Sequence, residues 1–340
     1  SVKANEASEP FLFSGWTNRC GWVKNEGNQP VNFTFEIDEA GNNEWKTLKS
    51  VTVNAGKATS VPFLSTERGE WIRVKTDKNT MATVSFNYTS PDIRSTSSDS
   101  IYKGLTTVDK TTTTGGLLYG LGDNRRALGL LANVTVDGKI SETGYYEMGD
   151  KLELIRKEDA KTADLIRSKF AIPQQVISIE ESSVLVVDDL GRRWRLPLGN
   201  ETYKKLTDQG VLRICREVAT ERDLFSCMGT FYELPAENAD GYAKIRPVST
   251  HNYRINDYAS YRGMLVLTGV TPEDGKENPH VVISDDGKAA VWVGVIDDLW
   301  TLGKPVGQGG PWKDTDVKTD VASDPYLIAF YDKKELSLSH

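Results

Sequence analysis

The chain has 340 residues, a formal net charge of -7 and a sequence pI near 5.3. This acidic balance leaves no broad basic surface, which excludes nucleic acid and anionic membrane surfaces as the main partner. No apolar run approaches the roughly 20 residues of a membrane helix, so we expect no insertion into a membrane.

Aromatic residues and turn formers dominate the composition. Eight Trp, thirteen Tyr and ten Phe accompany 29 Gly, and apolar residues at helical spacing are scarce. This combination favours strands and turns and predicts an all-β chain. The chain begins at Ser1 and not at Met, and it carries no signal peptide. We interpret it as a mature or trimmed form of an exported protein, periplasmic or extracellular.

The few cysteines and histidines predict neither a metal site nor a disulfide framework. Cys20, Cys215 and Cys227 lack the spacing of a zinc site, so we expect free thiols, with a Cys215–Cys227 bridge as the alternative. The acid-rich turns at Asp137 and Asp285 lack the spaced ligands of a calcium loop. We therefore predict no cofactor and leave a structural calcium ion open, with nothing in the sequence that supports it.

The first part of the chain, residues 8–89, alternates apolar and polar residues in short stretches. Residues 31–37 have the period of two that a half-buried strand requires. Further strands are predicted at residues 45–53, 59–63, 71–76 and 81–88. The pattern predicts one antiparallel module, either a blade or a sandwich-like domain.

Residues 90–114 are rich in Ser, Thr and Asp and predict a linker or a long crossing loop. From residue 115 to residue 340 the strand pattern resumes. Strands are expected at residues 117–121, 127–136, 145–155, 176–179, 184–187, 194–196, 211–215, 225–231, 242–245, 261–268, 280–283 and 289–295. Two short helices interrupt them near 158–170 and 201–210.

Regularly spaced turns suggest how these strands assemble. Asp137-Gly138, Asp188-Asp189 and Asp285-Asp286 each separate two predicted strands, as the hairpins of propeller blades do. We predict a β-propeller of about five blades. The alternative is a β-sandwich at residues 8–89 followed by a smaller propeller or barrel, divided at residues 90–114.

The two ends of the chain are alike. Residues 323–340 align without a gap on residues 8–25, and both windows begin Ser, an acid, Pro, an aromatic residue and Leu. Matching strand units at the N- and C-termini are expected in a β-ring or in an array of repeats.

The glycine- and tryptophan-rich string from Asp298 to Trp312, followed by Ser323-Asp-Pro-Tyr-Leu, resembles exported bacterial proteins of unassigned activity that accompany polysaccharide-degrading enzymes. More loosely, the whole chain resembles the β-propeller glycoside hydrolases and lyases. The resemblance implies a role in polysaccharide degradation. It implies no catalytic residue, because no family motif matches position by position.

Two glutamates are the leading catalytic pair. Cleavage of a glycosidic bond needs two carboxyl groups about 5 to 10 Å apart. Glu142 and Glu233 lie beside turns and aromatic residues, with Glu147 and Glu237 as near-equal substitutes. The first hypothesis is therefore a secreted glycoside hydrolase that cleaves a plant or algal polysaccharide fragment.

Arginines near these acids suggest a substrate that contains uronic acid, because guanidinium groups bind carboxylates in bidentate fashion. The polar residues expected to contact an oligosaccharide or polysaccharide come from the predicted loops and strand ends. They are Arg125, Arg126, Tyr145, Glu237, Arg254, Tyr258, Arg262 and Trp312. For the arginines, the alternative is that they pair with nearby acids and hold loops in place.

Two alternatives use other residues. In a polysaccharide lyase, His251 would abstract the proton at C5 of a uronate while an arginine neutralises the carboxylate. In a non-catalytic glycan-binding or scaffold module, aromatic side chains such as Trp312 would stack on sugar rings without any acid pair. Loss of Glu142 or Glu233 should impair only the hydrolase, and loss of His251 or Tyr258 only the lyase.

Overall fold

The computed structural model describes residues 1–122 and 126–339. The chain divides into two compact units, residues 1–93 and residues 94–340. Strands hold 40% of the residues and helices 11%, which confirms the prediction of an all-β chain. The described part contains no helix that is both long and apolar enough to span a membrane.

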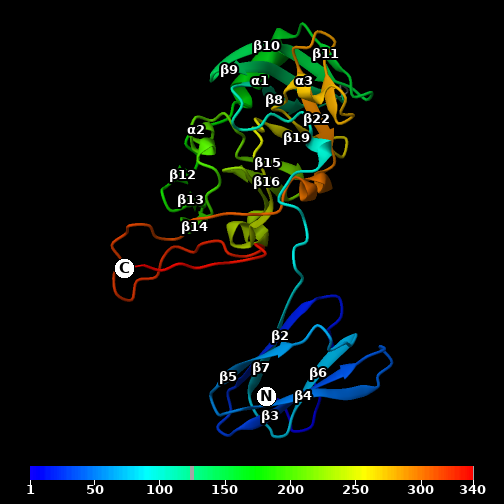
Figure 1. The fold of residues 1–340 in the computed structure, drawn as a ribbon, viewed down its shortest axis with the longest axis vertical. Coiled ribbons are helices and arrows are strands. Elements are labelled where there is room, and N and C mark those ends of the chain that lie inside the picture. The colour runs from blue at the N-terminus through cyan, green and yellow to red at the C-terminus, as the bar shows by residue number, and fades with distance from the viewer. Residues whose placement is uncertain (123–125, 340) are drawn as a thin grey trace. The chain divides into compact units, whose positions relative to one another are not determined.

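The first unit is a β-sandwich of seven described strands (Figure 1). One sheet has the strand order β1-β6-β3-β4 and the other has the order β5-β2-β7. The strands are β1 (Phe11–Leu12), β2 (Asn18–Asn25), β3 (Val31–Asp38), β4 (Trp45–Val53), β5 (Ala58–Phe63), β6 (Trp71–Thr76) and β7 (Ala82–Thr89).

One apolar core holds the two sheets of the sandwich together. Val31, Phe33 and Phe35, at alternate positions of β3, are completely buried. The ring of Phe35 meets the ring of Phe63 on the opposite sheet edge-on, at 5.6 Å between centroids. The predicted alternation in residues 31–37 is therefore the inward face of β3, as expected for sheets packed face to face.

The second unit contains four further antiparallel sheets among its described residues. Their strand orders are β11-β10-β9-β8, β12-β13-β14, β15-β16-β17-β18 and β19-β20-β22-β21. The strands of the first two sheets are β8 (Thr112–Gly120), β9 (Leu128–Val136), β10 (Lys139–Met148), β11 (Leu154–Arg156), β12 (Ser178–Ile179), β13 (Val184–Val187) and β14 (Arg193–Leu196). Those of the other two are β15 (Cys215–Ala219), β16 (Arg222–Cys227), β17 (Thr230–Pro235), β18 (Arg246–Thr250), β19 (Tyr258–Tyr261), β20 (Met264–Leu267), β21 (Val281–Ile283) and β22 (Ala290–Gly294).

Short helices lie between and beside the strands of the second unit. They are η1 (Ser100–Tyr102), α1 (Ala160–Lys169), α2 (Thr202–Asp208), η2 (Glu237–Ala239), η3 (Gly241–Lys244), α3 (Pro272–Gly275) and η4 (Ile296–Thr301). Asp159 caps α1, because its carboxylate accepts a hydrogen bond from the backbone N–H of Thr162 at 3.0 Å.

A buried aspartate joins three of these sheets. Asp257, next to β19, has no exposed surface. It accepts hydrogen bonds from Arg213 at 2.9 and 3.1 Å, and from the backbone N–H of Leu118 on β8 at 2.9 Å. Arg216 of β15 lies 3.3 Å away. A buried charge needs such partners, and here they fix the sheets to one another.

Residues 94–114 pack onto the second unit. Tyr102 is completely buried and stacks on Trp292 of β22, with 5.0 Å between ring centroids. Leu105 is also buried, and it pairs with Val270 through an isolated bridge. The few apolar residues of this segment thus meet the core directly, although the composition of residues 90–114 predicts a linker or a crossing loop.

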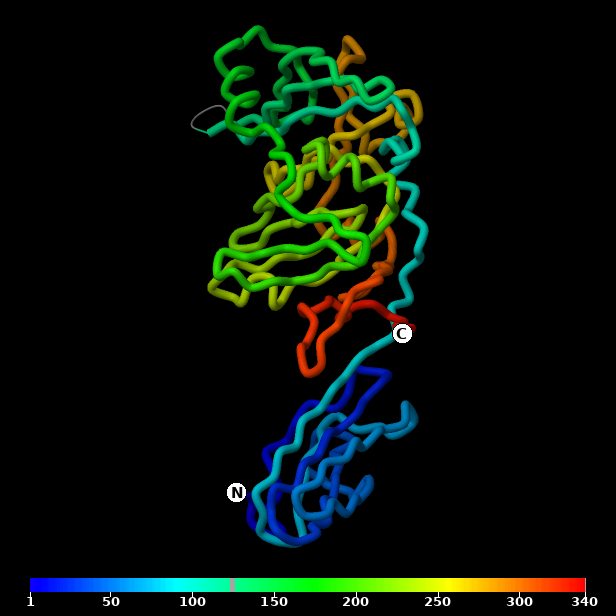
Figure 2. The backbone as a smooth tube through the Cα atoms, turned by 90° about the vertical axis from the view of Figure 1, so that its left-hand side faces the viewer, coloured from blue at the N-terminus to red at the C-terminus, as the bar shows by residue number. Residues whose placement is uncertain are grey.

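The matching segments at the two ends of the chain each pair with the edge of a sheet, but only over one or two residues. Phe11 and Leu12 form the edge strand β1 beside β6. At the other end, Tyr326 pairs in parallel with Arg195 of β14. The last part of the chain, orange to red in Figure 2, runs as loops beside the sheets of the second unit. The similarity in structure ends there. Residues 18–25 form β2 between β5 and β7, whereas residues 328–339 form no strand.

The predicted ring of about five blades is not confirmed. None of the described sheets closes on itself. The described residues give one sandwich and four open sheets, so a propeller stays a prediction. Cys20, Cys215 and Cys227 are free thiols, as expected.

Candidate functional site

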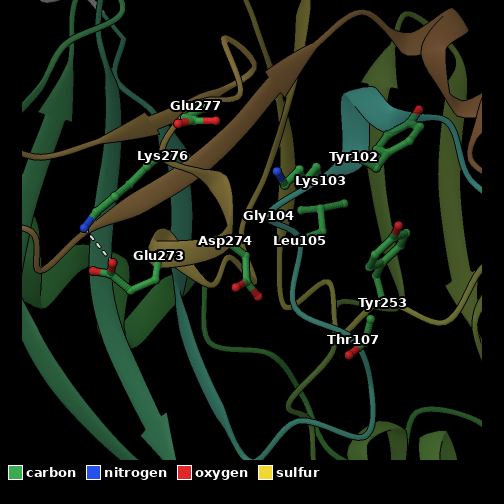
Figure 3. Close-up of a pocket in the computed structure, with 10 residues that line it drawn as sticks. All are labelled: Tyr102, Lys103, Gly104, Leu105, Thr107, Tyr253, Glu273, Asp274, Lys276 and Glu277. Atoms are coloured by element: carbon green, nitrogen blue, oxygen red, sulfur yellow. Dashed lines mark hydrogen bonds and ion pairs between the residues drawn. The ribbon is translucent and has the colours of Figure 1, made fainter.

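A hollow of about 590 Å³ opens on the second unit where three segments meet (Figure 3). They are the stretch that follows η1, the loop that contains Tyr253, and α3 with the residues after it. The residues that line the hollow are Tyr102, Lys103, Gly104, Leu105, Thr107, Tyr253, Glu273, Asp274, Lys276 and Glu277.

Backbone contacts hold these segments close together. Thr107 pairs with Tyr253 through an isolated bridge, and the N–H of Thr271 donates to the carbonyl of Gly104 at 2.8 Å. Gly104 has a φ of +102°, and a Cβ atom there would lie 2.6 Å from the Cα of Gly275. Only glycine permits both this conformation and this approach of α3.

One aromatic ring of the hollow remains partly exposed. Tyr253 lies between Tyr102 and the ring of His251, at centroid distances of 6.4 and 6.1 Å. Tyr102 is fully buried, whereas Tyr253 retains part of its surface. Tyr253 is therefore the ring that a ligand in the hollow can reach.

Charged side chains of both signs line the hollow. Lys276 forms an ion pair with Glu273 at 2.5 Å, and Asp274 pairs with Lys110. Lys103 and Glu277 also line the hollow, and neither has an ion-pair partner among the residues that the structure describes. The hollow thus combines one partly exposed aromatic ring with an ammonium group and a carboxylate that have no ion-pair partner in the described part of the chain.

The structure places the two predicted catalytic glutamates on different sheets, each with its own arginine. Glu142 on β10 accepts two hydrogen bonds from Arg167 of α1, at 2.8 and 3.1 Å. Glu233 on β17 forms an ion pair with Arg222 of β16. No contact among the described residues joins the two carboxylates.

His251 is partly buried, and its Nε2 atom is enclosed without a hydrogen-bond partner among the described residues. Burial lowers the pKa of His251 to about 3, and its Nδ1 accepts a hydrogen bond from the backbone N–H of Tyr253 at 3.1 Å. The ring packs near Phe231, at 5.1 Å between centroids. These contacts favour the neutral imidazole and fix the ring beside Tyr253.

Two more predicted contact residues are interior residues. Tyr258 is fully buried, and its hydroxyl donates to the carbonyl of Leu224 at 2.7 Å. Arg254 is only 6% exposed, and burial lowers its pKa. Neither lines the hollow, although Tyr253 is the immediate neighbour of Arg254 in the chain.

Four predicted residues make local contacts elsewhere in the second unit. The Tyr145 hydroxyl donates to Glu147 at 2.8 Å, within β10. Glu237 pairs with Arg192 at 3.2 Å. Arg126 and Arg262 both contact Tyr261. The Tyr261 hydroxyl donates a hydrogen bond to the backbone carbonyl of Arg126 and accepts one from Nε of Arg262.

Trp312 is 47% exposed and does not line the hollow. Arg125 lies outside the described residues. The predicted residues are therefore spread over the second unit, and the structure does not gather them in one pocket.

The residues that line the hollow are not among those predicted from the sequence. Residues 272–277 form only a short helix and a turn, and their three acids have the composition of an ordinary surface loop. Tyr253 lies between two residues that were predicted, His251 and Arg254. Isolated bridges at Leu105 and Thr107 and single backbone hydrogen bonds bring these segments together, and no sequence periodicity encodes such contacts.

In the part of the chain that the structure describes, no group of three or more His, Cys, Asp or Glu side chains is placed to hold a metal ion. Comparison with known proteins found no matching family model, no matching curated protein and no matching solved structure. The function must therefore be argued from the site itself.

Proposed function

We propose that this protein binds an oligosaccharide or polysaccharide chain in the Tyr253 hollow and does not cleave it. The observation that supports this proposal best is a partly exposed tyrosine ring in a hollow that is also lined by a lysine and a carboxylate without ion-pair partners among the described residues. An aromatic face packs against the apolar face of a sugar, and charged groups accept or donate hydrogen bonds at its hydroxyls. Few polar groups around one apolar surface are typical of ligand pockets.

The state of the predicted catalytic residues favours binding over catalysis. Glu142 and Glu233 are each held by an arginine on a separate sheet, which does not resemble a pair that shares one glycosidic bond. The pKa of His251 is lowered to about 3, so its imidazole is a weak base and a poor candidate for the base of a lyase. The proposal therefore prefers the glycan-binding hypothesis to the two enzymatic ones.

A glycoside hydrolase remains the second candidate because of one observation. The hollow itself contains three carboxylates, Glu273, Asp274 and Glu277, so an acid pair different from the predicted one is available. In that case Glu273, which is ion-paired with Lys276, would serve as base or nucleophile, and Glu277 would serve as the acid.

The proposed setting is that of an exported bacterial protein, periplasmic or extracellular, that acts alongside polysaccharide-degrading enzymes. We also propose that the open sheets of the second unit are blades of a propeller-like arrangement. Three of them connect their strands in chain order, as propeller blades do.

The experiment compares the binding of neutral oligosaccharides by wild-type protein, Tyr253→Ala and Trp312→Ala, by isothermal titration calorimetry. Tyr253→Ala should weaken binding by about tenfold or more, as expected for loss of a central aromatic contact. Trp312→Ala is the matched control, since it removes an exposed aromatic ring outside the hollow. Equal affinities of wild type and Tyr253→Ala would overturn the proposal.

Released product tests the second candidate in the same samples. Cleavage that is lost in Glu277→Gln would establish the hydrolase and remove the claim of binding without chemistry.

A further inference from the structure

A second hollow, of about 300 Å³, lies on the sheet formed by β15 to β18. Arg222 of β16, Glu233 of β17 and Arg246 of β18 are among its lining residues. Glu233 and Arg246 are directly opposite each other in the β17–β18 ladder. Side chains opposite each other in a ladder share one face of the sheet, so these residues form a charged floor.

The positive charges in this hollow exceed the negative ones. Arg222 is neutralised by its ion pair with Glu233. Lys244 and Arg246 have no carboxylate partner among the described residues, and Glu221 is the one remaining acid of the lining. A local excess of positive charge in a chain of net charge -7 attracts an anion to this place.

The C-terminal segment helps to orient Arg246. The guanidinium carbon of Arg246 lies 5.0 Å from the centre of the ring of Phe330, which belongs to this segment. Stacking on a ring holds the guanidinium plane while its N–H groups at the edge stay free to donate. The fork of donors is thus arranged in advance for a planar, bidentate acceptor.

We propose that Arg246 and Lys244 bind the carboxylate of an acidic sugar, a uronic acid residue of a saccharide. Arg246 donates two parallel hydrogen bonds to the carboxylate, and the Lys244 ammonium contributes a third contact. Glu233, still paired with Arg222, accepts a hydrogen bond from a sugar hydroxyl at the floor of the hollow. The sequence predicts that arginines recognise uronic acid. In this proposal Arg246 has that role, in place of Arg126, Arg254 and Arg262.

This site is separate from the Tyr253 hollow, since the two share no lining residue. The experiment is a titration followed by nuclear magnetic resonance with three probes at equal ionic strength. The probes are a trigalacturonate, a neutral trisaccharide and acetate. Tighter binding of trigalacturonate than of the other two is expected, because both the carboxylate and the sugar ring contribute.

Arg246→Gln and Lys244→Gln should each weaken trigalacturonate binding, Arg246→Gln by about tenfold because the bidentate contact is lost. Lys161→Gln, an exposed lysine on α1, is the matched control and should bind like wild type. In Tyr253→Ala, the signals of the residues that line the second hollow should respond to trigalacturonate as they do in wild type, which separates this site from the proposed function.

Three results would overturn the proposal. They are unchanged affinity in Arg246→Gln, equal affinity for acetate and trigalacturonate, and no binding of trigalacturonate. Arg246 and Lys244 are exposed, so their variants are expected to fold, and their melting temperatures verify this.

Discussion

A different kind of interaction stabilises the interior of each of the two units. The sandwich of residues 1–93 has one apolar core, in which Phe35 and Ile72 are completely buried. The unit of residues 94–340 also has apolar clusters, but the buried carboxylate of Asp257 ties three of its sheets together. An apolar core follows from the alternation of each strand, whereas a buried ion network depends on residues far apart in the sequence. Stability should therefore respond to different substitutions in the two units.

The largest effect is expected at the buried aspartate. Asp257→Ala leaves Arg213 and Arg216 without their counter-ion inside the second unit, which typically costs about 3–5 kcal/mol. Chemical denaturation should show this loss in the transition of the second unit and leave that of the sandwich unchanged. Asp189→Ala, at an exposed turn, should change neither transition. A second-unit transition that did not move would show that the ion network is dispensable.

The corresponding substitution in the sandwich removes a core ring. Phe35→Ala should destabilise the first unit by about 3 kcal/mol, because it removes buried apolar surface and leaves a cavity. Chemical denaturation should show this loss of stability in the unfolding transition of the first unit alone. Leu64→Ala, which truncates a side chain that is 65% exposed, provides the control. Similar effects of the two substitutions would contradict a single tightly packed core.

The buried histidine gives the second unit a dependence on pH. Because its pKa is lowered to about 3, folding keeps His251 neutral while the unfolded chain takes up a proton below its usual value. Stability is therefore complete above pH 6.5 and falls as the pH falls towards 3, by about 2 kcal/mol at pH 5. The free energy of unfolding of His251→Asn should lose this dependence between pH 7 and 5, and that of His280→Asn should keep it.

Asp286, in a surface turn, should make a smaller contribution to stability, which is lost in more acidic solution. Burial alone would raise the pKa of Asp286, but hydrogen bonds from Ser284, Tyr146 and the Lys288 N–H lower it to about 2. These bonds stabilise the fold above pH 4, and the contribution is lost as the pH falls from about 4 to 2. Because the side chain is one-third exposed, Asp286→Asn should cost only about 1 kcal/mol at pH 7. Thermal unfolding of the two proteins should converge near pH 2, and a constant difference would contradict this assignment.

The sequence was most informative where one strand face is buried. Residues 31–37 predict the observed strand β3 to within one residue, because Val31, Phe33 and Phe35 all point into one core. The same alternation near the C-terminus, Leu336 and Leu338 between polar residues, forms no strand. A strand needs a neighbour to pair with, and residues 328–339 have none among the described strands.

The candidate sites were less accessible from the sequence. Glu142 was predicted from its aromatic neighbours, but its ion pair with Arg167 depends on how α1 packs against the sheet. Tyr253 and Glu277 line the same hollow, and Gly104 permits the close approach of α3 to the segment that follows η1. Such contacts arise from tertiary packing, and no local pattern in one sequence reveals them.

The most direct test of saccharide binding in the Tyr253 hollow is one titration of protein labelled with carbon-13 in its tyrosine rings. A neutral oligosaccharide is added while the ring signals and the anomeric signals of the sugar are followed together. The account predicts that the Tyr253 ring signals shift and saturate while the sugar signals stay those of the intact oligosaccharide. Unmoved Tyr253 signals at saturating sugar, or new reducing-end signals that grow with time, would contradict it.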